Sequence, residues 1–196
     1  MQAPLQYSLY GYGLSMSSLR PFLVGAGCIS DLEMRSGSKA LSKLWGGQLI
    51  EHSCLADPTK VLGSLPEEGG LVQLLGDAAM HNSQGFSWME ALGAWRRPII
   101  LMVVPTPSGN IPGTASAYSA LCKSLKVPLV GIIQLGGDWD SLNRRLDGLA
   151  WCGWLPRDHQ PEMDGDEPLL KYDLLQTKKT VLILRQKLIN LNINAQ

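Results

Sequence analysis

The sequence predicts an α/β domain in which a mostly parallel sheet is flanked by helices. Two observations carry this prediction. Apolar runs at Leu71–Leu75 and Ile99–Val104 are bounded by Gly or Pro, which is typical of strands buried on both faces, and Val127–Ile133 is predicted as a further buried strand. Segments with helical spacing lie between such runs, so strands and helices alternate along the chain.

The stretch from Arg97 to Gly137 shows the alternation best, because it contains a strand, a loop, a helix and a second strand. The loop holds three Pro and two Gly between Pro105 and Gly113. The helix after it has an apolar stripe at helical spacing, formed by Ala117, Tyr118, Leu121, Cys122 and Leu125. We expect a right-handed crossover, with the loop at the carboxyl end of the first strand, where open α/β sheets bind ligands.

The other elements follow from local signals. The expected strands are Leu19–Val24 and Trp151–Leu155, and the expected helices are Ser36–Trp45, a short helix opened by Asp57-Pro58, Ser87–Trp95, Asp140–Leu149 and Thr177–Leu191. Asp57 is expected to be an N-cap with Pro58 at the first helical position, and Ser87 with Glu90 has capping-box spacing. A strand from Val181 to Leu184 stays open as the alternative for the tail.

Domain organisation is simple. Residues 1–19 form an N-terminal arm without a clear period, and residues 20–196 form a single α/β domain. The polar stretch from Arg157 to Pro168 includes an acidic loop at 158–167, for which an exposed loop is expected rather than a calcium site.

Composition excludes several classes of function. Seventeen basic residues balance seventeen acidic ones, and no basic run is present, so neither a nucleic-acid partner nor a membrane partner is expected. The four Cys and three His do not cluster, so no metal site is expected from ligand spacing. No signal peptide and no apolar run long enough for a membrane span is visible, which predicts a cytoplasmic protein.

The candidate ligand site is the loop between Pro105 and Gly113. Gly109 would let the backbone approach a ligand, and Thr114 would cap the following helix. A tight connection and a binding loop are equally compatible with this pattern. The phosphate-binding motif G-x-x-x-x-G-K-S/T occurs nowhere, and Gly25-Ala26-Gly27 is better explained as a turn that ends a strand. Ser36 to Lys39 is better explained as a helix cap than as an anion site.

From Arg20 to Leu175 the order of segments resembles dethiobiotin synthase and, more distantly, the cobyrinate amidotransferase synthetases. RPIILMVVPTPSGNIPGTASAYSAL is similar to that family's strand, L-G-x-I-N-H loop and helix, VPLVGIIQLGG to its next strand, and WCGWLP to its G-x-x-P segment beside the nucleotide base. Arg20-Pro21 resembles the family's Lys-Pro, and MRSGSKAL its N-S-D-A-L helix start. The resemblance implies a P-loop NTPase fold that lacks the first strand, P-loop and helix.

The same resemblance assigns site residues and shows departures. Arg20 takes the place of the substrate-contacting Lys, the ligand-binding loop comprises Ser108, Gly109, Asn110 and Thr114, and Gln134 and Pro156 lie on the nucleotide-base side. The family's magnesium-binding Asp falls on Lys39. A second acidic position falls on Leu75, which leaves Asp77 as the weak candidate for a metal ligand. The family's substrate-loop Asn and His fall on Pro112 and Gly113.

Phosphoryl transfer depends on positioning and on charge neutralisation by Lys, backbone N–H groups and a metal ion. The absence of the phosphate-binding P-loop therefore favours a dethiobiotin-synthase-like domain that has lost ATP-dependent catalysis. Such a domain would serve as a binding, scaffold or regulatory protein. The alternative is an ATP-dependent and magnesium-dependent ligase of biotin biosynthesis with an atypical phosphate site or one supplied in trans. A third, less favoured hypothesis is that the reading frame starts upstream of Met1. The resemblance also implies a homodimer, and a protein partner is a further possibility.

Overall fold

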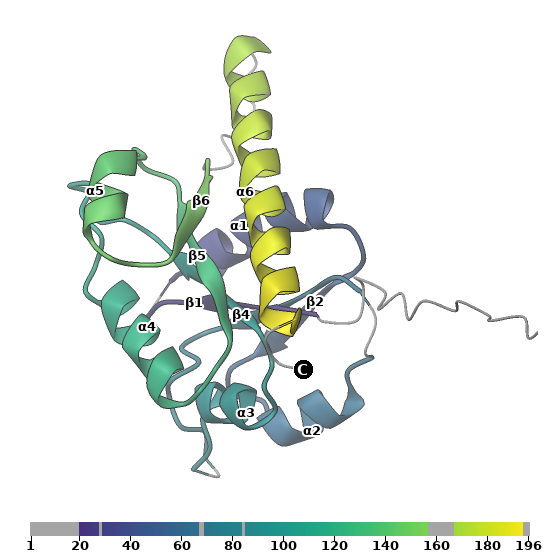
Figure 1. Ribbon diagram of the computed structural model, residues 1–196. Helices are drawn as coiled ribbons and strands as arrows, with labels where there is room; N and C mark the ends of the chain where they lie inside the picture. The colour runs from purple at the N-terminus through teal and green to yellow at the C-terminus, as the bar shows by residue number, and fades with distance from the viewer. Residues whose placement is uncertain (1–19, 28, 67–68, 84, 157–166, 194–196) are drawn as a thin grey trace, which may run out of the picture.

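The computed structural model describes residues 20–27, 29–66, 69–83, 85–156 and 167–193, and shows a six-stranded parallel sheet (Figure 1). Its strands are β1 (Phe22–Gly25), β2 (Leu49–Ser53), β3 (Leu71–Leu75), β4 (Ile99–Val103), β5 (Leu129–Leu135) and β6 (Trp151–Leu155). Their order is β2-β3-β1-β4-β5-β6, and every pairing is parallel. The predicted fold class is confirmed. The predicted arm and the 158–166 part of the acidic loop lie outside the described residues.

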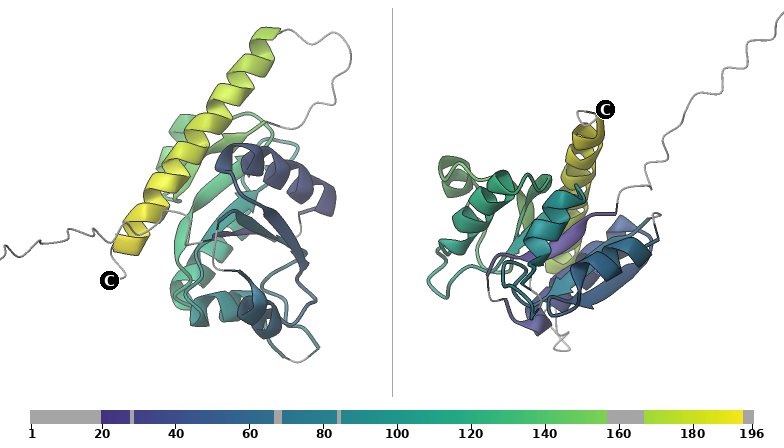
Figure 2. Two further views of the ribbon diagram at one scale, coloured as in Figure 1. Left: turned by 90° about the vertical axis from the view of Figure 1, so that its right-hand side faces the viewer. Right: turned by 90° about the horizontal axis from the view of Figure 1, so that it is seen from below.

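Helices cover both faces of this sheet (Figure 2). They are α1 (Asp31–Trp45), α2 (Pro58–Ser64), α3 (Trp88–Ala94), α4 (Thr114–Ser124), α5 (Ser141–Leu146) and α6 (Glu167–Ile193). One apolar cluster joins α1 and α6 to the sheet, through side chains such as Met34, Leu41 and Leu184. A second cluster joins α2, α3 and α4 to the opposite face, through Leu62, Trp88 and Tyr118. Two separate cores therefore sandwich the sheet.

Two of the predicted helix starts are confirmed in detail. The Asp57 carboxylate accepts hydrogen bonds from the N–H groups of Thr59 at 3.0 Å and Lys60 at 3.4 Å. Ser87 and Glu90 form both halves of a capping box. These caps are worth about 1 kcal/mol each, and they depend only on residues two or three positions apart.

Two other predicted starts are wrong. The helix expected from Ser36 begins five residues earlier, because Ser30 is its N-cap and accepts a hydrogen bond from the N–H of Glu33 at 3.2 Å. Thr114 does not cap α4, because Gly113 occupies the N-cap position and makes no side-chain hydrogen bond. In both cases a hydroxyl residue that resembled a cap lies inside the helix.

The sequence did not predict β2, and the ends of some predicted helices differ from those in the structure. β2 lies at the edge of the described sheet, and its LIEHS sequence mixes apolar and polar side chains because, within the described residues, it pairs with β3 alone. The tail forms the long helix α6, so the alternative strand from Val181 to Leu184 is wrong. The expected helix Asp140–Leu149 is shorter, and α5 ends at Leu146.

The position of β1 bears on the expected absence of a first strand–loop–helix unit. β1 lies between β3 and β4, and a short loop connects it to α1. The centre of the sheet is therefore occupied by a strand, a loop and a helix, so the topology lends no support to a missing unit. Within the described residues, no helix is both long enough and apolar enough to cross a membrane.

Candidate functional site

The carboxyl edge of the sheet gathers most of the candidate residues. Because all six strands are parallel, the loops that follow them emerge at this one edge. The connection after β1 leads to α1 on one face, whereas the connection after its neighbour β4 leads to α4 on the other face. Such a switch point separates the two loops and is where open α/β sheets bind ligands.

The loop after β4 is stabilised by its own polar groups. Thr106 Oγ1 lies 2.9 Å from Ser108 Oγ, and Asn110 donates from Nδ2 to Ser108 Oγ at 3.1 Å. The N–H of Thr106 donates to the Asn110 carbonyl at 2.8 Å, and Gly109 has a φ of 80° with open space around it. The side chains of Ser108 and Asn110 therefore stabilise an exposed turn, and only Gly109 leaves room for close approach to the backbone.

Thr114 lies at the centre of the carboxyl edge, where the loops after β1 and β4 meet. A Cβ on Gly27 would approach the Thr114 side chain to 3.0 Å, so the absence of a side chain at Gly27 permits this contact. Because Gly113 makes no side-chain cap, the first turn of α4 keeps N–H groups that no side chain satisfies. The contact leaves little space between the two loops.

Asp77, the weak metal candidate, is held by protein groups. Its Oδ1 accepts hydrogen bonds from the Tyr118 hydroxyl and, at 2.9 Å, from the N–H of Ala79. Burial, and then this hydrogen bond to Asp77, raises the pKa of the Tyr118 phenol. Burial, and then the charges of Asp77 and Asp31, raises the pKa of the nearby Cys54 thiol to about 12. Among the described residues, no three His, Cys, Asp or Glu side chains are grouped to hold a metal ion.

Gln134 is fully buried, and its amide is committed to internal contacts. Its Nε2 donates to the carbonyls of Gly136 at 2.8 Å and Asp138 at 3.0 Å, and its Oε1 accepts from Arg144 Nε at 3.1 Å. The Arg144 guanidinium in turn lies 5.3 Å from the centre of the Trp151 ring. Gln134 thus fixes the turn after β5. To read a nucleotide base, it would have to exchange these hydrogen bonds for others.

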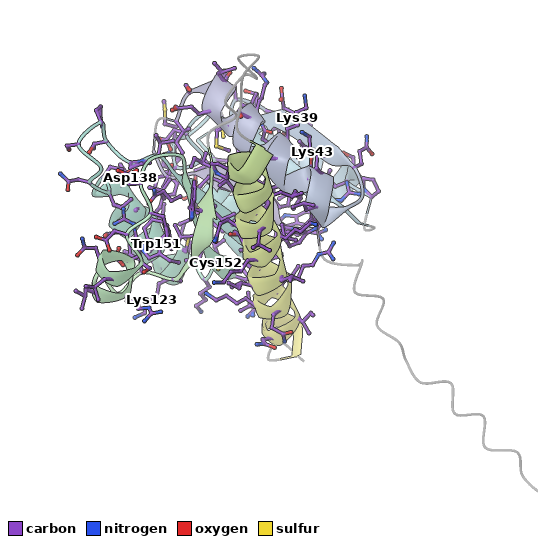
Figure 3. The ribbon with its side chains drawn as sticks, turned by 90° about the horizontal axis from the view of Figure 1, so that it is seen from above. Lys39, Lys43, Lys123, Asp138, Trp151 and Cys152 are labelled. Carbon is purple, nitrogen blue, oxygen red and sulfur yellow. The ribbon has the colours of Figure 1, made fainter. Side chains whose placement is uncertain are left out.

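Pro156 lines a small cavity beside this turn. The cavity has a volume of about 200 Å³ and is lined by Leu32, Glu33, Ser36, Gly37, Leu135, Gly136 and Pro156. These residues come from the first two turns of α1 and from the ends of β5 and β6. Figure 3 looks onto this region from above and shows Asp138 on the loop after β5. The cavity combines apolar walls with one carboxylate.

The start of α1 is acidic and capped by its own residues. Ser30 Oγ donates to Glu33 Oε2 at 2.8 Å while it accepts from the N–H of Glu33, and Asp31 lies in the same turn. A helix start attracts anions through free N–H groups and its dipole. Here the Ser30 hydroxyl and the carboxylates of Asp31 and Glu33 already lie at the helix start.

Arg20 lies far from all of these loops. It precedes β1, so it is at the amino edge of the sheet, and its side chain is 5% exposed. The structure therefore brings together the residues of the β4–α4 loop, Thr114 and Asp77 at one edge, and leaves Arg20 at the other.

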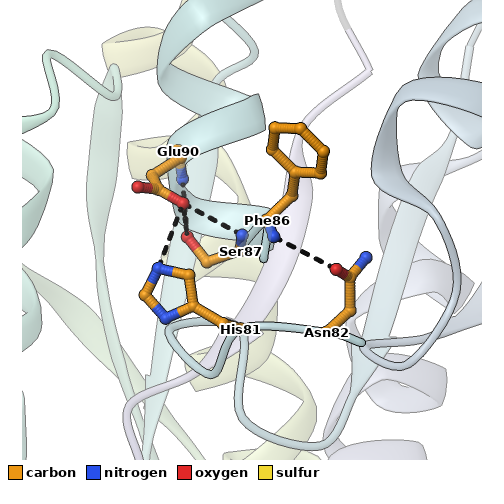
Figure 4. A network of polar contacts seen from close by, with 5 residues as sticks. All are labelled: His81, Asn82, Phe86, Ser87 and Glu90. Carbon is orange, nitrogen blue, oxygen red and sulfur yellow. Dashed lines mark hydrogen bonds and ion pairs between the residues drawn. The ribbon is translucent and has the colours of Figure 1, made fainter. Parts of the chain in front are cut away.

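Sequence reasoning did not single out the short hairpin after β3 (Figure 4). His81 and Ser87 form an antiparallel bridge, the Phe86 N–H donates to Asn82 Oδ1 at 3.1 Å, and His81 Nε2 lies 3.6 Å from Glu90 Oε2. The sequence predicted the capping box of Ser87 and Glu90, but it did not predict that His81 lies next to Glu90. This network fixes the loop that starts with Asp77.

Comparisons with known proteins assign no family to the chain. No family model matches it, and no curated protein matches it. Among solved structures it is similar to the MinD cell division protein of Aquifex aeolicus, with 10% sequence identity, coverage of 88% of this chain and 97% of that chain, and a TM-score of 0.43. A likeness at this level assigns no activity, ligand or partner to this chain.

Proposed function

We propose that this chain is a dethiobiotin-synthase-like domain that has lost ATP-dependent catalysis and serves as a binding, scaffold or regulatory protein. The observation that carries the proposal is the start of α1. In a strand–loop–helix unit at the centre of a parallel sheet, this is the position where a phosphate would be held. Here Ser30 caps the helix, and Asp31 and Glu33 lie in its first turn.

The electrostatics of this position oppose a triphosphate. Two carboxylates repel phosphate oxygens, and the loop sequence Gly25 to Ser30 contains no Lys or Arg to offset them. Phosphoryl transfer requires charge neutralisation at the transferred group, so a site of this kind would not stabilise its transition state.

The cavity beside Pro156 supports a binding role. Its volume of about 200 Å³ is below the range of typical drug-sized ligand sites, so it would accommodate a small ligand or part of a larger one. Leu32, Leu135 and Pro156 offer apolar contact, and Glu33 favours an uncharged or cationic group over an anionic one.

Calorimetric titration with ATP, with and without magnesium, tests the loss of nucleotide function, and a dethiobiotin-formation assay tests the loss of catalysis. We expect no magnesium-dependent binding up to millimolar ATP and no turnover. Dethiobiotin formation at an ordinary enzymatic rate would refute the proposal.

One observation favours the alternative of an ATP-dependent ligase with an atypical phosphate site. The start of α4 lacks a side-chain cap and faces the loop after β1 through Thr114 and Gly27. If phosphate binds there, a carboxylate in the first turn should abolish the binding. Thr114→Glu would then lose magnesium-dependent ATP binding, whereas Ala120→Glu, with the same charge change at an exposed position later in α4, would keep it.

Homodimer formation, cytoplasmic location and a protein partner stay predictions. The resemblance implies a two-fold axis near the loop Ser108–Gly113, and the exposure of residues 106–110 is compatible with such a contact. Sedimentation equilibrium of the chain and of its Asn110→Arg variant tests the dimer. We expect a dimer that the variant weakens, and a monomer at all concentrations would exclude it.

A further inference from the structure

Arg96 and Lys126 have a backbone conformation that usually belongs to glycine. Their φ angles are 49° and 56°, and within the described residues they are the non-glycine positions with positive φ. A side chain in this left-handed region costs on the order of 1 kcal/mol, and such outliers are retained mainly where the residue has a role. Both outliers are basic.

The two residues occupy equivalent turns. The N–H of Arg97 donates to the Leu92 carbonyl at 2.9 Å, and the N–H of Val127 donates to the Cys122 carbonyl at 2.9 Å. Each bond closes the end of a helix in the same way, with Arg96 and Lys126 at the residue just before the donor. The usual residue at this position is Gly. Arg96 and Lys126 therefore both replace the expected Gly at the end of a helix.

The fold brings these turns together. They lead into β4 and β5, which are neighbouring strands, and the N–H of Ile99 donates to the Pro128 carbonyl at 2.9 Å. Adjacent strands lie about 4.8 Å apart, so the turns are adjacent at the amino edge. They also contact each other directly, because a Cβ on Gly93 would lie only 2.3 Å from the Leu125 carbonyl oxygen.

Further cations surround the pair. Arg97 is half-buried, and its Nε is buried without a hydrogen-bond partner. Lys123 lies exposed in the last turn of α4, and Arg20 precedes β1, the other neighbour of β4. Arg96, Arg97, Lys123 and Lys126 form no ion pair with any carboxylate that the structure describes. The local concentration of positive charge is therefore not neutralised within this part of the chain.

A favourable interaction with the helix dipole explains only part of this cluster of basic residues. Basic residues at helix C-termini stabilise by a few tenths of a kcal/mol to about 1 kcal/mol, and Lys123 fits that role. It does not explain why strained positions hold Arg96 and Lys126, nor why Arg97 keeps an unused buried donor. An anion bound between the turns would explain both features.

We propose that the turns α3–β4 and α4–β5 form a binding site for a small multivalent oxyanion, such as a phosphate ester or a tricarboxylate. Arg96, Arg97 and Lys126 hold it, and Arg97 donates from Nε. Guanidinium groups bind such anions through paired hydrogen bonds, which Lys126 supplements as a point charge. The site lies at the opposite edge of the sheet from the proposed ligand cavity and does not depend on it.

The test uses glycine variants, because Gly relieves the strain while it removes the charge. Arg96→Gly and Lys126→Gly should keep the melting temperature of the protein or raise it. Titration with inorganic pyrophosphate at constant ionic strength should show binding by the unmodified chain that weakens about tenfold in each variant. Arg97→Gln, which keeps a polar amide but removes the positive charge, should weaken it at least as much.

The matched control is the double variant Lys39→Gln, Lys43→Gln. These lysines project from α1 on the other side of the molecule from Lys123 (Figure 3), and the double variant removes two positive charges where each glycine variant removes one. Unchanged pyrophosphate affinity in this control supports a specific site. Equal weakening in control and glycine variants, or no binding at millimolar pyrophosphate, would overturn the proposal. Retention on vesicles of anionic lipid that pyrophosphate cannot release would overturn it in favour of a membrane surface.

Discussion

The two edges of the sheet differ in charge although the chain is neutral overall. Acidic residues predominate after the strands at the carboxyl edge, where the structure describes Asp31, Glu33, Asp57, Asp77, Glu90, Asp138 and Asp140, and where Lys60 pairs with Asp57. Basic residues predominate before the strands at the amino edge, where it describes Arg20, Lys43, Arg96, Arg97, Lys123 and Lys126, whereas the acidic Asp147 precedes β6. In a parallel sheet every connecting helix starts at the carboxyl edge, so acids at helix starts and bases at helix ends accumulate at opposite edges.

Charge preferences at the ends of single helices can therefore create a charge gradient across a whole domain. An enzyme that binds phosphate at the carboxyl edge must reverse the gradient locally with Lys, a metal ion or uncapped N–H groups. At α1, Ser30, Asp31 and Glu33 reinforce the gradient instead. At the amino edge, Arg96 and Lys126 reinforce it at the expense of backbone strain.

The largest expected effect concerns the contact that joins the two basic turns. Gly93→Val would place side-chain atoms against the Leu125 carbonyl oxygen, so we expect a loss of about 3 kcal/mol in the free energy of unfolding. Gly63→Ala is the control, because Gly63 is exposed in α2 and its nearest atom would be 4.0 Å from the new Cβ. Urea denaturation checks both variants, and equal stability of the two would show that the turns do not depend on close contact.

The second effect is a loss of stability at alkaline pH. The pKa values of Cys54 and Cys122 are raised from 9.0 to about 12, mainly by burial. A raised pKa contributes stability that is present below pH 9 and is lost as the pH rises toward 12. We expect a loss on the order of 2 kcal/mol per thiol near pH 11. Denaturation as a function of pH should show a smaller loss in Cys54→Ala, and identical profiles would contradict the assignment.

The third effect tests the polar centre of the carboxyl edge. Tyr118→Phe removes the hydroxyl that donates to the half-buried Asp77 carboxylate, which should cost about 1.5 kcal/mol. Ser119→Ala removes a hydroxyl that bonds only within α4, to the Ala115 carbonyl at 2.8 Å, and should cost less than about 0.5 kcal/mol. Thermal unfolding of the two variants separates these values. A larger effect for Ser119 would mean that Asp77 is not stabilised by Tyr118.

The smallest effect tests the cap of α1. Ser30→Ala removes a hydroxyl that both accepts from and donates to Glu33, so we expect a loss of about 1 kcal/mol. We expect no gain in ATP binding, because Asp31 and Glu33 stay in the first turn. Binding of ATP by this variant alone would show that Ser30, and not the carboxylates, keeps phosphate away.

Local chemistry predicted much of the fold. The caps at Asp57 and Ser87 and the apolar run of β4 were predicted correctly because each depends on neighbouring residues or on uniform burial. β2 was missed because an edge strand needs no continuous apolar run, and α1 was started too late because Ser36 resembles a cap as closely as Ser30 does.

The site was less predictable because it depends on which edge each loop occupies. Sequence similarity grouped Arg20 with Ser108 and Asn110, but the order of the strands places Arg20 at the opposite edge. The absence of a basic run in the sequence also concealed the cations at the amino edge, since Arg96 and Lys126 come from separate turns. Only the pairing of β4 with β5 reveals that they are neighbours.

We propose that the carboxyl edge of the sheet does not bind a nucleoside triphosphate. The most direct test is calorimetric titration of ATP into the Arg96→Gly, Lys126→Gly double variant, with and without magnesium, because this variant lacks the proposed oxyanion site. We predict no heat of binding in either titration. Magnesium-dependent binding with micromolar affinity in this variant would contradict the claim, and it would direct attention to the start of α4 as a phosphate site.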